Sequence, residues 1–119
     1  RRGIVAQITR LQGERVTAEQ IRGAAELHAE VQAINLGPGC AIVSLPGEFF
    51  VETGQAIQKA AGIKHLLVAC YTNHHLMYVP PKHEFERGGY EPGVAILEED
   101  SEAAFRRAAI DLLREVAVK

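Results

Sequence analysis

Aromatic residues are scarce in this chain of 119 residues, which has no tryptophan, four phenylalanines and three tyrosines. A platform that stacks nucleobases needs several aromatic side chains, so we do not expect this kind of nucleic-acid binder. Positive charge is not in excess either, since 13 lysines and arginines stand against 15 aspartates and glutamates. The net charge of −2 argues against a nucleic acid or an anionic membrane as a partner held by charge alone.

Long apolar runs and cysteine motifs are also missing. No run approaches the roughly 20 residues that a membrane-spanning helix needs, so we expect no transmembrane segment. The two cysteines, Cys40 and Cys70, are too few for a disulfide-built scaffold, and neither lies in a CxxC or CxxH spacing. Each is part of an apolar run, which predicts buried thiols in adjacent strands.

The composition is that of one folded domain. Hydrophobic residues make up 47% of the chain and charged residues 24%, which is typical of globular rather than disordered sequences. The length suits a single core. The chain begins at Arg1 and its one methionine is Met77, so we expect residues 1–119 to be a single domain or a piece of something longer.

Strand and helix patterns alternate along the chain. Strands are expected at residues 3–9, 30–36, 40–45 and 65–71, with a polar continuation over 72–78 and a short extended segment over 94–97. Helices are expected after the capping box at 17–20, and over 48–61, 82–87 and 101–116. Gly37-Pro38-Gly39 predicts a hairpin turn. This order predicts an α/β fold, a mixed sheet with helices packed on it, in which 40–45 and 65–71 are parallel strands joined by a helical crossover.

The last predicted helix, over 101–116, is strongly amphipathic. Its spacing turns Glu102 and three arginines toward solvent. Its predicted buried face consists of Phe105, Ala108, Ala109, Leu112 and Val116.

Glu48 directly follows the break that Pro46-Gly47 makes after an apolar strand. Ligands in open α/β sheets bind beyond the carboxyl ends of strands, so this carboxylate is a candidate metal ligand or general base. The alternative is that Glu48 begins the next helix and stabilises its first turn.

Polar side chains are concentrated after the other central strand. Five polar side chains stand at its end or follow it and are expected at the same edge of the sheet as Glu48: Tyr71, Asn73, His74, His75 and Tyr78. One interpretation is a self-contained zinc site of His74 or His75 with acceptors from the next segment, because imidazole and carboxylate suit zinc. Those partners would be His83, Glu84 or Glu86. The other interpretation is that the histidines are ordinary loop residues.

Glycines surround Tyr90 in the stretch Gly88-Gly89-Tyr90-Glu91-Pro92-Gly93. Glycine permits tight turns and a close approach of the backbone, so Tyr90 can present its phenol to a pocket. The alternative is that Tyr90 anchors a loop.

These three junctions together resemble the neutral/alkaline (non-lysosomal) ceramidase family, and most closely its shorter bacterial members. The matching stretches, in order, are Leu45-Pro46-Gly47-Glu48-Phe49, Asn73 with Tyr78-Val79, Glu84-Phe85 and Gly89-Tyr90-Glu91. The resemblance covers roughly residues 30 to 116 and corresponds to the final part of the family's catalytic domain. It implies that residues 1–119 are a C-terminal fragment of a larger catalytic domain.

The resemblance implies a zinc-dependent amidase that cleaves the N-acyl bond of ceramide. Members bind zinc with two histidines, a glutamate and a tyrosine, and Glu48 and Tyr78 match the last two. Tyr90 matches a further active-site tyrosine that contacts the reacting amide. Asn73 matches the asparagine of the family stretch, and His75 replaces its first tyrosine, which makes both candidates for substrate binding.

The two histidine ligands of the family have no match in this chain, because they come from segments well upstream. The resemblance therefore implies that the chain alone binds zinc poorly and is inactive, and that its partner is the N-terminal portion of the same protein or another chain. A lipid amide substrate also needs an apolar channel. The candidates for its wall are Phe49, Phe50, Leu76 and Met77, which are otherwise ordinary core residues.

Two other functions are compatible with these residues. The chain can be a related hydrolase of a non-ceramide amide, since a fold does not fix a substrate. It can also be a stand-alone binding or assembly domain that has lost catalysis. The larger-domain interpretation predicts an open, apolar side, whereas the stand-alone interpretation predicts a closed, polar one.

Overall fold

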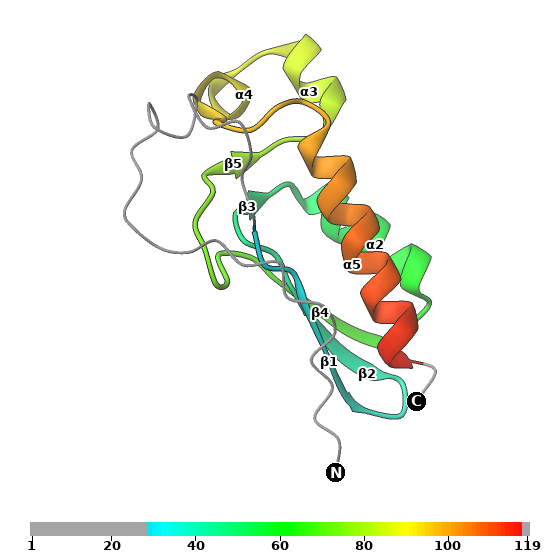
Figure 1. Ribbon diagram of the computed structural model, residues 1–119. Helices are drawn as coiled ribbons and strands as arrows, with labels where there is room; N and C mark the ends of the chain where they lie inside the picture. Colours follow the sequence, from blue (N-terminus) through cyan, green and yellow to red (C-terminus); the bar gives the residue numbers. More distant parts are fainter. Residues whose placement is uncertain (1–28, 118–119) are drawn as a thin grey trace.

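The computed structural model describes residues 29–117, which form a mixed three-stranded sheet covered by helices (Figure 1). Its strands are β1 (Gln32–Gly37), β2 (Cys40–Ser44) and β4 (His65–Ala69), in the order β1-β2-β4. The pair β1–β2 is antiparallel, and β2–β4 is parallel, with Cys40 opposite His65 and Ser44 opposite Ala69. The predicted α/β class and the parallel crossover pair are therefore confirmed.

The hairpin between β1 and β2 is fixed by glycine and by Asn35. Gly37 and Gly39 have φ angles of 136° and 70°, which side chains other than glycine rarely adopt. Asn35 Oδ1 accepts a hydrogen bond of 2.8 Å from the Gly37 backbone N–H, and Asn35 Nδ2 donates one of 2.8 Å to the Val116 carbonyl. Asn35 thus ties the hairpin to the end of the last helix.

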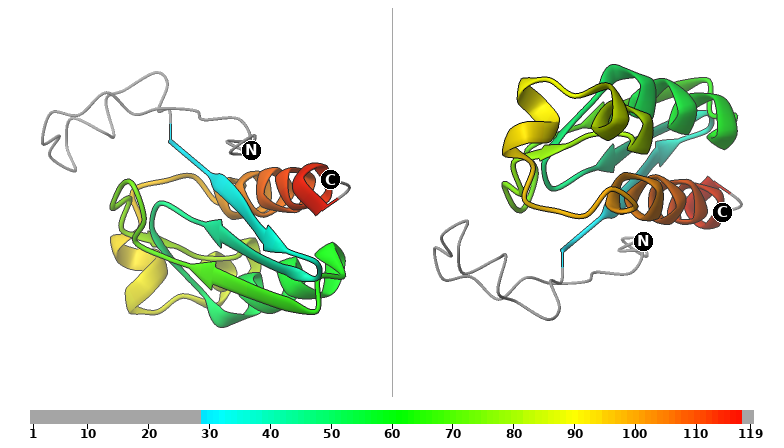
Figure 2. Two further views of the ribbon diagram at one scale, coloured as in Figure 1. Left: turned by 90° about the horizontal axis from the view of Figure 1, so that it is seen from below. Right: turned by 90° about the horizontal axis from the view of Figure 1, so that it is seen from above.

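Two helices, α2 (Val51–Ala61) and α5 (Ser101–Ala117), pack against each other and on one face of the sheet (Figures 1 and 2). Alternate strand residues point toward these helices, as period-two alternation requires. The fully enclosed core residues are aliphatic. They are Val31, Ala33, Ala41, Val43, Leu45, Ile57, Ala109, Leu112, Leu113 and Val116.

On the other face of the sheet, residues 29–117 leave a row of apolar side chains open. Ile34 of β1 is opposite Ile42 of β2, which is opposite Leu67 of β4, so the three side chains form one row across the sheet. Ile34 is 39% exposed and Leu67 is 59% exposed, and neighbouring Leu36 is 58% exposed. We call these four residues, Ile34, Leu36, Ile42 and Leu67, the open apolar face.

Glu102 is buried, so its predicted solvent exposure is wrong. Its carboxylate is 4% exposed at the contact between α2 and α5. The Thr53 hydroxyl donates a 2.8 Å hydrogen bond to Glu102 Oε1, and Arg106 Nε forms a 3.0 Å ion pair with the same oxygen. A buried charge is tolerated because both partners are present. Ala108 is exposed, contrary to prediction, and Leu113 takes a place on the buried face of α5.

The helix predicted from Glu48 begins later. Glu48 and Phe49 form a short strand, β3 (Glu48–Phe49), and α2 starts at Val51 after Phe50, whose backbone is extended. The Glu48 backbone N–H donates a 2.8 Å hydrogen bond to the Met77 carbonyl, which holds this segment extended. Glu48 therefore does not lie in the first turn of a helix, and the first-turn alternative is wrong.

The strand predicted at 65–71 ends at Ala69, and its polar continuation is not a strand until β5 (Tyr78–Val79). The strand does not continue because the chain reverses direction between β4 and β5. The predicted helix at 82–87 is confirmed as α3 (Lys82–Arg87). A further helix, α4 (Tyr90–Val94), includes the start of the extended segment predicted at 94–97, and residues 95–97 form no strand.

Cys40 and Cys70 are only half-buried, because Cys40 begins β2 at the hairpin and Cys70 follows the last residue of β4. The prediction of fully buried thiols is therefore wrong. The strand at 3–9, the capping box and the helix after it lie outside the described residues. Within residues 29–117, the helices are all too short or too polar to cross a membrane.

Candidate functional site

Glu48 and Tyr78 are brought side by side by a second, two-stranded sheet. In the parallel pair β3–β5, Glu48 is the register partner of Tyr78, and Phe49 is the partner of Val79. This pair follows the carboxyl ends of β2 and β4, in the upper part of Figure 1. Two residues separated by 30 positions in the sequence thus meet at the predicted edge of the sheet.

The segment between β4 and β5 folds back onto the segment before β3. Backbone hydrogen bonds join Tyr71 N to the Gly47 carbonyl at 3.1 Å, Leu76 N to the Pro46 carbonyl at 2.9 Å, and Glu48 N to the Met77 carbonyl at 2.8 Å. We call residues 70–77 the clamp loop. It fixes the backbone on both sides of Glu48.

The clamp loop contains three non-glycine residues in the left-handed region. Tyr71, Asn73 and Met77 have φ angles of 58°, 65° and 60°. Such a conformation costs roughly 1–3 kcal/mol per residue and persists only where the surrounding structure imposes it. In this structure, the backbone hydrogen bonds to residues 46–48 impose the left-handed conformation. The clamp loop is therefore held in one backbone conformation.

Gly47 allows the close approach of the two segments. A Cβ at this position would lie 3.0 Å from the Met77 carbonyl oxygen and 3.0 Å from Val79 Cγ2. A residue with a side chain would therefore push the clamp loop and β5 away from Glu48. From the sequence, Gly47 is a strand breaker and part of a family-like stretch, but this close approach has no signal there.

Tyr90 lies next to Tyr78. Gly88 and Gly89 have φ angles of 76° and 124°, so the predicted glycine turn is present, and Tyr90 then begins α4. The two phenol rings meet edge to face, with ring centres 5.9 Å apart and an angle of 80° between the planes. Tyr90 is 68% exposed, so its hydroxyl remains available to a ligand.

Tyr71 is a fourth member of this cluster. It belongs to the polar group predicted after the second central strand, but no role was predicted for it. Hydrogen bonding to Glu48 raises the pKa of Tyr71 to about 12, with smaller contributions from burial and from the charge of Glu48. Burial raises the pKa of Tyr78, and the charge of Glu48 and hydrogen bonding to it act in the same direction. Both phenols keep their protons at neutral pH and are available as donors to Glu48.

Asn73 and His75, the two candidates for substrate binding, lie on the clamp loop. Asn73 Nδ2 is 3.4 Å from Ser44 Oγ, so its amide contacts the end of β2. The His75 ring stacks on Tyr71, with centres 5.2 Å apart and 22° between the planes. Both side chains are exposed, and His75 is joined to the cluster through Tyr71.

The donor set suits part of a metal site. Glu48 and Tyr78 offer a carboxylate and a phenol oxygen at adjacent positions, and catalytic zinc accepts a carboxylate within a set of at least three protein ligands. Within residues 29–117, no group of three or more His, Cys, Asp or Glu is close enough to hold a metal ion. The pair therefore fits a zinc site whose remaining ligands come from elsewhere.

Of the two interpretations of the histidines, the self-contained zinc site of the clamp loop and α3 is not found within residues 29–117. Glu84 Oε1 is 3.3 Å from His83 Nε2 and 3.5 Å from Arg87 Nη1, so these three groups pair with one another on α3. They do not gather with His74 or His75.

The four residues proposed for an apolar channel do not share one surface, and Met77 is half-buried on the clamp loop. Leu76 is 3% exposed, and Phe49 packs edge to face on Phe105 with ring centres 5.5 Å apart, so both are core residues. Phe50 is half-buried and, with Phe49, lines a cavity of about 210 Å³ between α2 and the end of β4. Val68 and Cys70 form its other wall.

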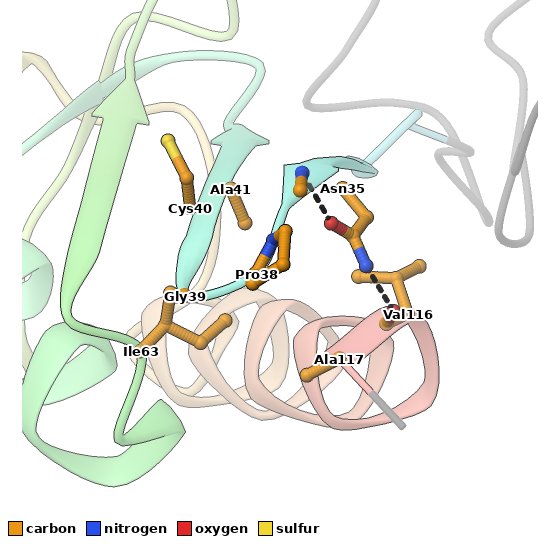
Figure 3. Close-up of a pocket in the computed structure, with 9 residues that line it drawn as sticks. Asn35, Pro38, Gly39, Cys40, Ala41, Ile63, Val116 and Ala117 are labelled. Carbon is orange, nitrogen blue, oxygen red and sulfur yellow. Dashed lines mark hydrogen bonds between the residues drawn. The ribbon is translucent and has the colours of Figure 1, made fainter. Parts of the chain in front are cut away.

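A larger cavity of about 320 Å³ lies at the opposite end of the sheet, beside the hairpin (Figure 3). Asn35, Cys40, Ile63 and Val116 are among its lining residues. It is therefore separate from the cluster around Glu48.

The structure is similar to solved ceramidases. A ceramidase complexed with C2 matches 75% of this chain with a TM-score of 0.66 and 26% sequence identity. The neutral ceramidase from Pseudomonas aeruginosa matches 76% of the chain with the same TM-score and identity. The chain spans 15% of the length of each of these proteins.

No protein-family model and no curated protein matches the sequence. The structural match nevertheless extends over three quarters of the chain and is accompanied by sequence identity. This chain is therefore related to the neutral ceramidase family.

Proposed function

We propose that this chain is part of a zinc-dependent amidohydrolase that cleaves the N-acyl amide of ceramide-like lipids. The observation that carries the proposal is the register pairing of Glu48 with Tyr78, with Tyr90 against Tyr78, in a chain related to neutral ceramidases. A carboxylate and two phenols converge beyond the carboxyl ends of the strands. This is where ligands bind in open α/β sheets.

In this proposal Glu48 and Tyr78 hold the zinc ion, together with two histidines from a segment beyond residues 29–117. When bound, the ion lowers the pKa of a water molecule toward about 7 and polarises the amide carbonyl. Glu48 contributes negative charge, and the Tyr78 phenol gives up its proton to bind. Burial raises the pKa of Tyr78, and the charge of Glu48 acts in the same direction, so a bound cation would favour loss of the phenol proton by offsetting the carboxylate.

Tyr90 is assigned to the reacting amide rather than to the metal. Tyr90 is an exposed residue at the start of α4, and its ring is in contact with that of Tyr78. A phenol in this position donates a hydrogen bond to the oxygen on which negative charge develops. Asn73 and His75 are assigned to the wall around the substrate.

A larger catalytic unit accounts for the open apolar face. Ile34, Ile42 and Leu67 present one apolar row, and exposed apolar patches of this kind mark surfaces that pack against another body. We assign this face to the rest of the catalytic unit, which also supplies the two histidines.

The test begins with the protein from its natural source. Its intact mass under denaturing conditions, its zinc content and its hydrolysis of ceramide are measured, and each is repeated for Glu48→Gln in the same full-length protein. We expect Glu48→Gln to lose zinc and turnover together. The matched control is Glu52→Gln, an exposed acid in the first turn of α2, which keeps both. Retention of zinc and turnover by Glu48→Gln would contradict the ligand assignment.

A second candidate substrate is a non-ceramide amide. The observation that favours it is the His75 ring stacked on Tyr71, where the family pattern has a tyrosine, because imidazole adds a polar group to the substrate wall. Comparing hydrolysis of ceramide with that of short N-acyl amides decides between the two. Preference for the short amides would assign a different substrate to the same site.

A further inference from the structure

β4 lies at the edge of the three-stranded sheet, in the order β1-β2-β4 (Figure 2). Two hydrogen bonds show which of its backbone groups face β2. The His65 N–H donates to the Gly39 carbonyl at 2.9 Å, and the Ala69 carbonyl accepts from the Leu45 N–H at 2.8 Å. Successive residues of a strand direct their backbone groups to opposite sides, so residues 65, 67 and 69 pair with β2, and residues 66 and 68 face the other way.

The outer side of β4 therefore carries the backbone groups of Leu66 and Val68. Gln58 Nε2 of α2 donates a 3.2 Å hydrogen bond to the Leu66 carbonyl. Within residues 29–117, the Leu66 N–H and both backbone groups of Val68 have no hydrogen-bond partner. Proteins commonly protect an edge strand with lysine, proline or a bulge, and β4 has none of these. This edge is able to pair with a further strand.

A cavity opens beside this edge, under α2. It is the cavity of about 210 Å³ described above, with Val68 and Cys70 on one side and Gly54 and Gln58 of α2 on the other. A Cβ at Gly54 would meet nothing within 4 Å in the described part of the chain, so the helix leaves room here. The Val68 side chain packs against the core on the helix side of the sheet. One face of an added strand would place its side chains level with Val68, in this cavity.

The open apolar face continues onto this edge. Leu67 lies between Leu66 and Val68 on β4 and is also the last residue of the apolar row. The open apolar face is assigned above to the rest of the catalytic unit, and the chain spans only 15% of the length of the ceramidases that it matches. A body that covers the open apolar face therefore reaches the outer side of β4.

We propose that the outer side of β4 and the cavity under α2 form a docking site for an extended segment from the rest of the catalytic unit. The segment pairs with the backbone of Leu66 and Val68 and places an apolar side chain in the cavity. In this mode of recognition, main-chain hydrogen bonds give affinity, and pockets for alternate side chains give specificity. The inference rests on the proposed function, because it takes this chain to be part of a larger catalytic unit.

Hydrogen exchange of the full-length protein from its natural source tests the pairing. Exchange is followed at single backbone amides by mass spectrometry. We expect the N–H groups of Leu66 and Val68 to exchange as slowly as that of Leu67, which faces β2. Free exchange at Leu66 and Val68, together with slow exchange at Leu67, would overturn the proposal.

Gly54→Leu in the full-length protein tests the cavity, because the new side chain would fill it from the helix. We expect the amides of Leu66 and Val68 to lose their slow exchange in this variant, while Leu67 keeps its own. Ala60→Leu is the matched control, since Ala60 is an exposed residue of α2 outside the cavity, and it should leave all three amides unchanged. Slow exchange at Leu66 and Val68 that persists in Gly54→Leu would contradict the docking site.

A photocrosslinker identifies the occupant. In the full-length protein, p-benzoylphenylalanine takes the place of Gln55, an exposed residue that lines the cavity. We expect a crosslink within one molecule, to a peptide outside residues 1–119. A crosslink to residues 1–28 or to a second molecule would show that the assigned occupant is wrong.

The docking site can fail while the zinc site stands. If Glu48→Gln loses zinc and turnover but Leu66 and Val68 exchange freely in the parent, only the docking site is overturned. If the natural protein has the mass of these 119 residues alone, both proposals are overturned.

Discussion

The backbone geometry around Glu48 depends on the absence of a side chain at Gly47. The missing Cβ of Gly47 allows the Met77 carbonyl to accept from Glu48 N, and this bond makes Glu48 part of a strand rather than of a helix. The carboxylate then lies beside Tyr78 instead of capping α2. The position of the Glu48 carboxylate, on which the proposed zinc site depends, is therefore set by a glycine without a functional side chain.

Gly47→Ala is expected to destabilise the fold by about 1–3 kcal/mol, the usual cost of overpacking a buried site. The added methyl group would lie 3.0 Å from a backbone oxygen, which cannot move without shifting the clamp loop. Urea unfolding followed by circular dichroism measures the change in the free energy of unfolding.

Gly54→Ala is the matched control for this variant. Gly54 lies within α2, and a Cβ there meets nothing within 4 Å. Alanine is preferred to glycine within a helix by roughly 0.5–1 kcal/mol, so this variant is expected to gain stability. Equal effects of the two substitutions would show that the contacts of Gly47 do not matter.

At the scale of elements, the long periodic segments were predictable and the short ones were not. The hairpin, the parallel pair β2–β4, the end of α2 at Gly62 and the helix α5 all follow from turn residues and apolar spacing. The strands β3 and β5 have two residues each, too few to show a period. Their pairing depends on backbone hydrogen bonds across the clamp loop, which leave no mark on residue type.

Some residues of the candidate site were also predictable from the sequence, and one role was not. Glu48, Tyr78 and Tyr90 were found through a family resemblance and through their positions after strands or glycines. Tyr71 was counted among the polar residues expected at this edge, but it received no role because it was assigned to the end of a strand. A positive φ at Tyr71 reverses the chain and turns an ordinary strand residue into a neighbour of Glu48.

The contact between α2 and α5 makes a prediction at this scale. Glu102→Leu removes the acceptor of the Thr53 hydroxyl, which is 1% exposed and has no water to replace it. An unsatisfied buried donor costs about 1–3 kcal/mol, so we expect a loss of this size in urea unfolding. Thr53→Val combined with Glu102→Leu replaces both partners with apolar groups and is expected to recover most of the loss.

The double-mutant cycle shows whether the two residues act as a pair. Costs of the single variants that simply add in the double variant would mean that Thr53 and Glu102 stabilise the helices independently. Glu115→Leu serves as the control, because Glu115 is an exposed acid on the same helix and its replacement is expected to change stability by no more than about 0.5 kcal/mol.

At the scale of the molecule, residues 29–117 form a sheet with helices on one face and a row of apolar side chains on the other. Most α/β domains cover both faces of a sheet, because each face must bury its apolar residues. The described residues cover one face with α2 and α5 and leave Ile34 and Leu67 exposed on the other. This asymmetry fits the larger-catalytic-unit interpretation and not the closed, polar surface expected of a stand-alone module.

The open apolar face leads to a prediction about the isolated chain, which we expect to self-associate as its concentration rises. Leu67→Lys places a charge at the end of the apolar row, in the middle of the edge strand β4, and charges on an edge strand oppose pairing with another molecule. We therefore expect Leu67→Lys to be monomeric in sedimentation velocity across the concentrations at which the parent chain associates.

Leu67 is 59% exposed, so folding stability should change by no more than about 0.5 kcal/mol. Val51→Lys, at a 69% exposed position on α2, adds the same charge away from this face and should leave association unchanged. If both variants associate like the parent, the open face is not the surface through which this chain meets another body, and the place of the missing zinc ligands must be sought elsewhere.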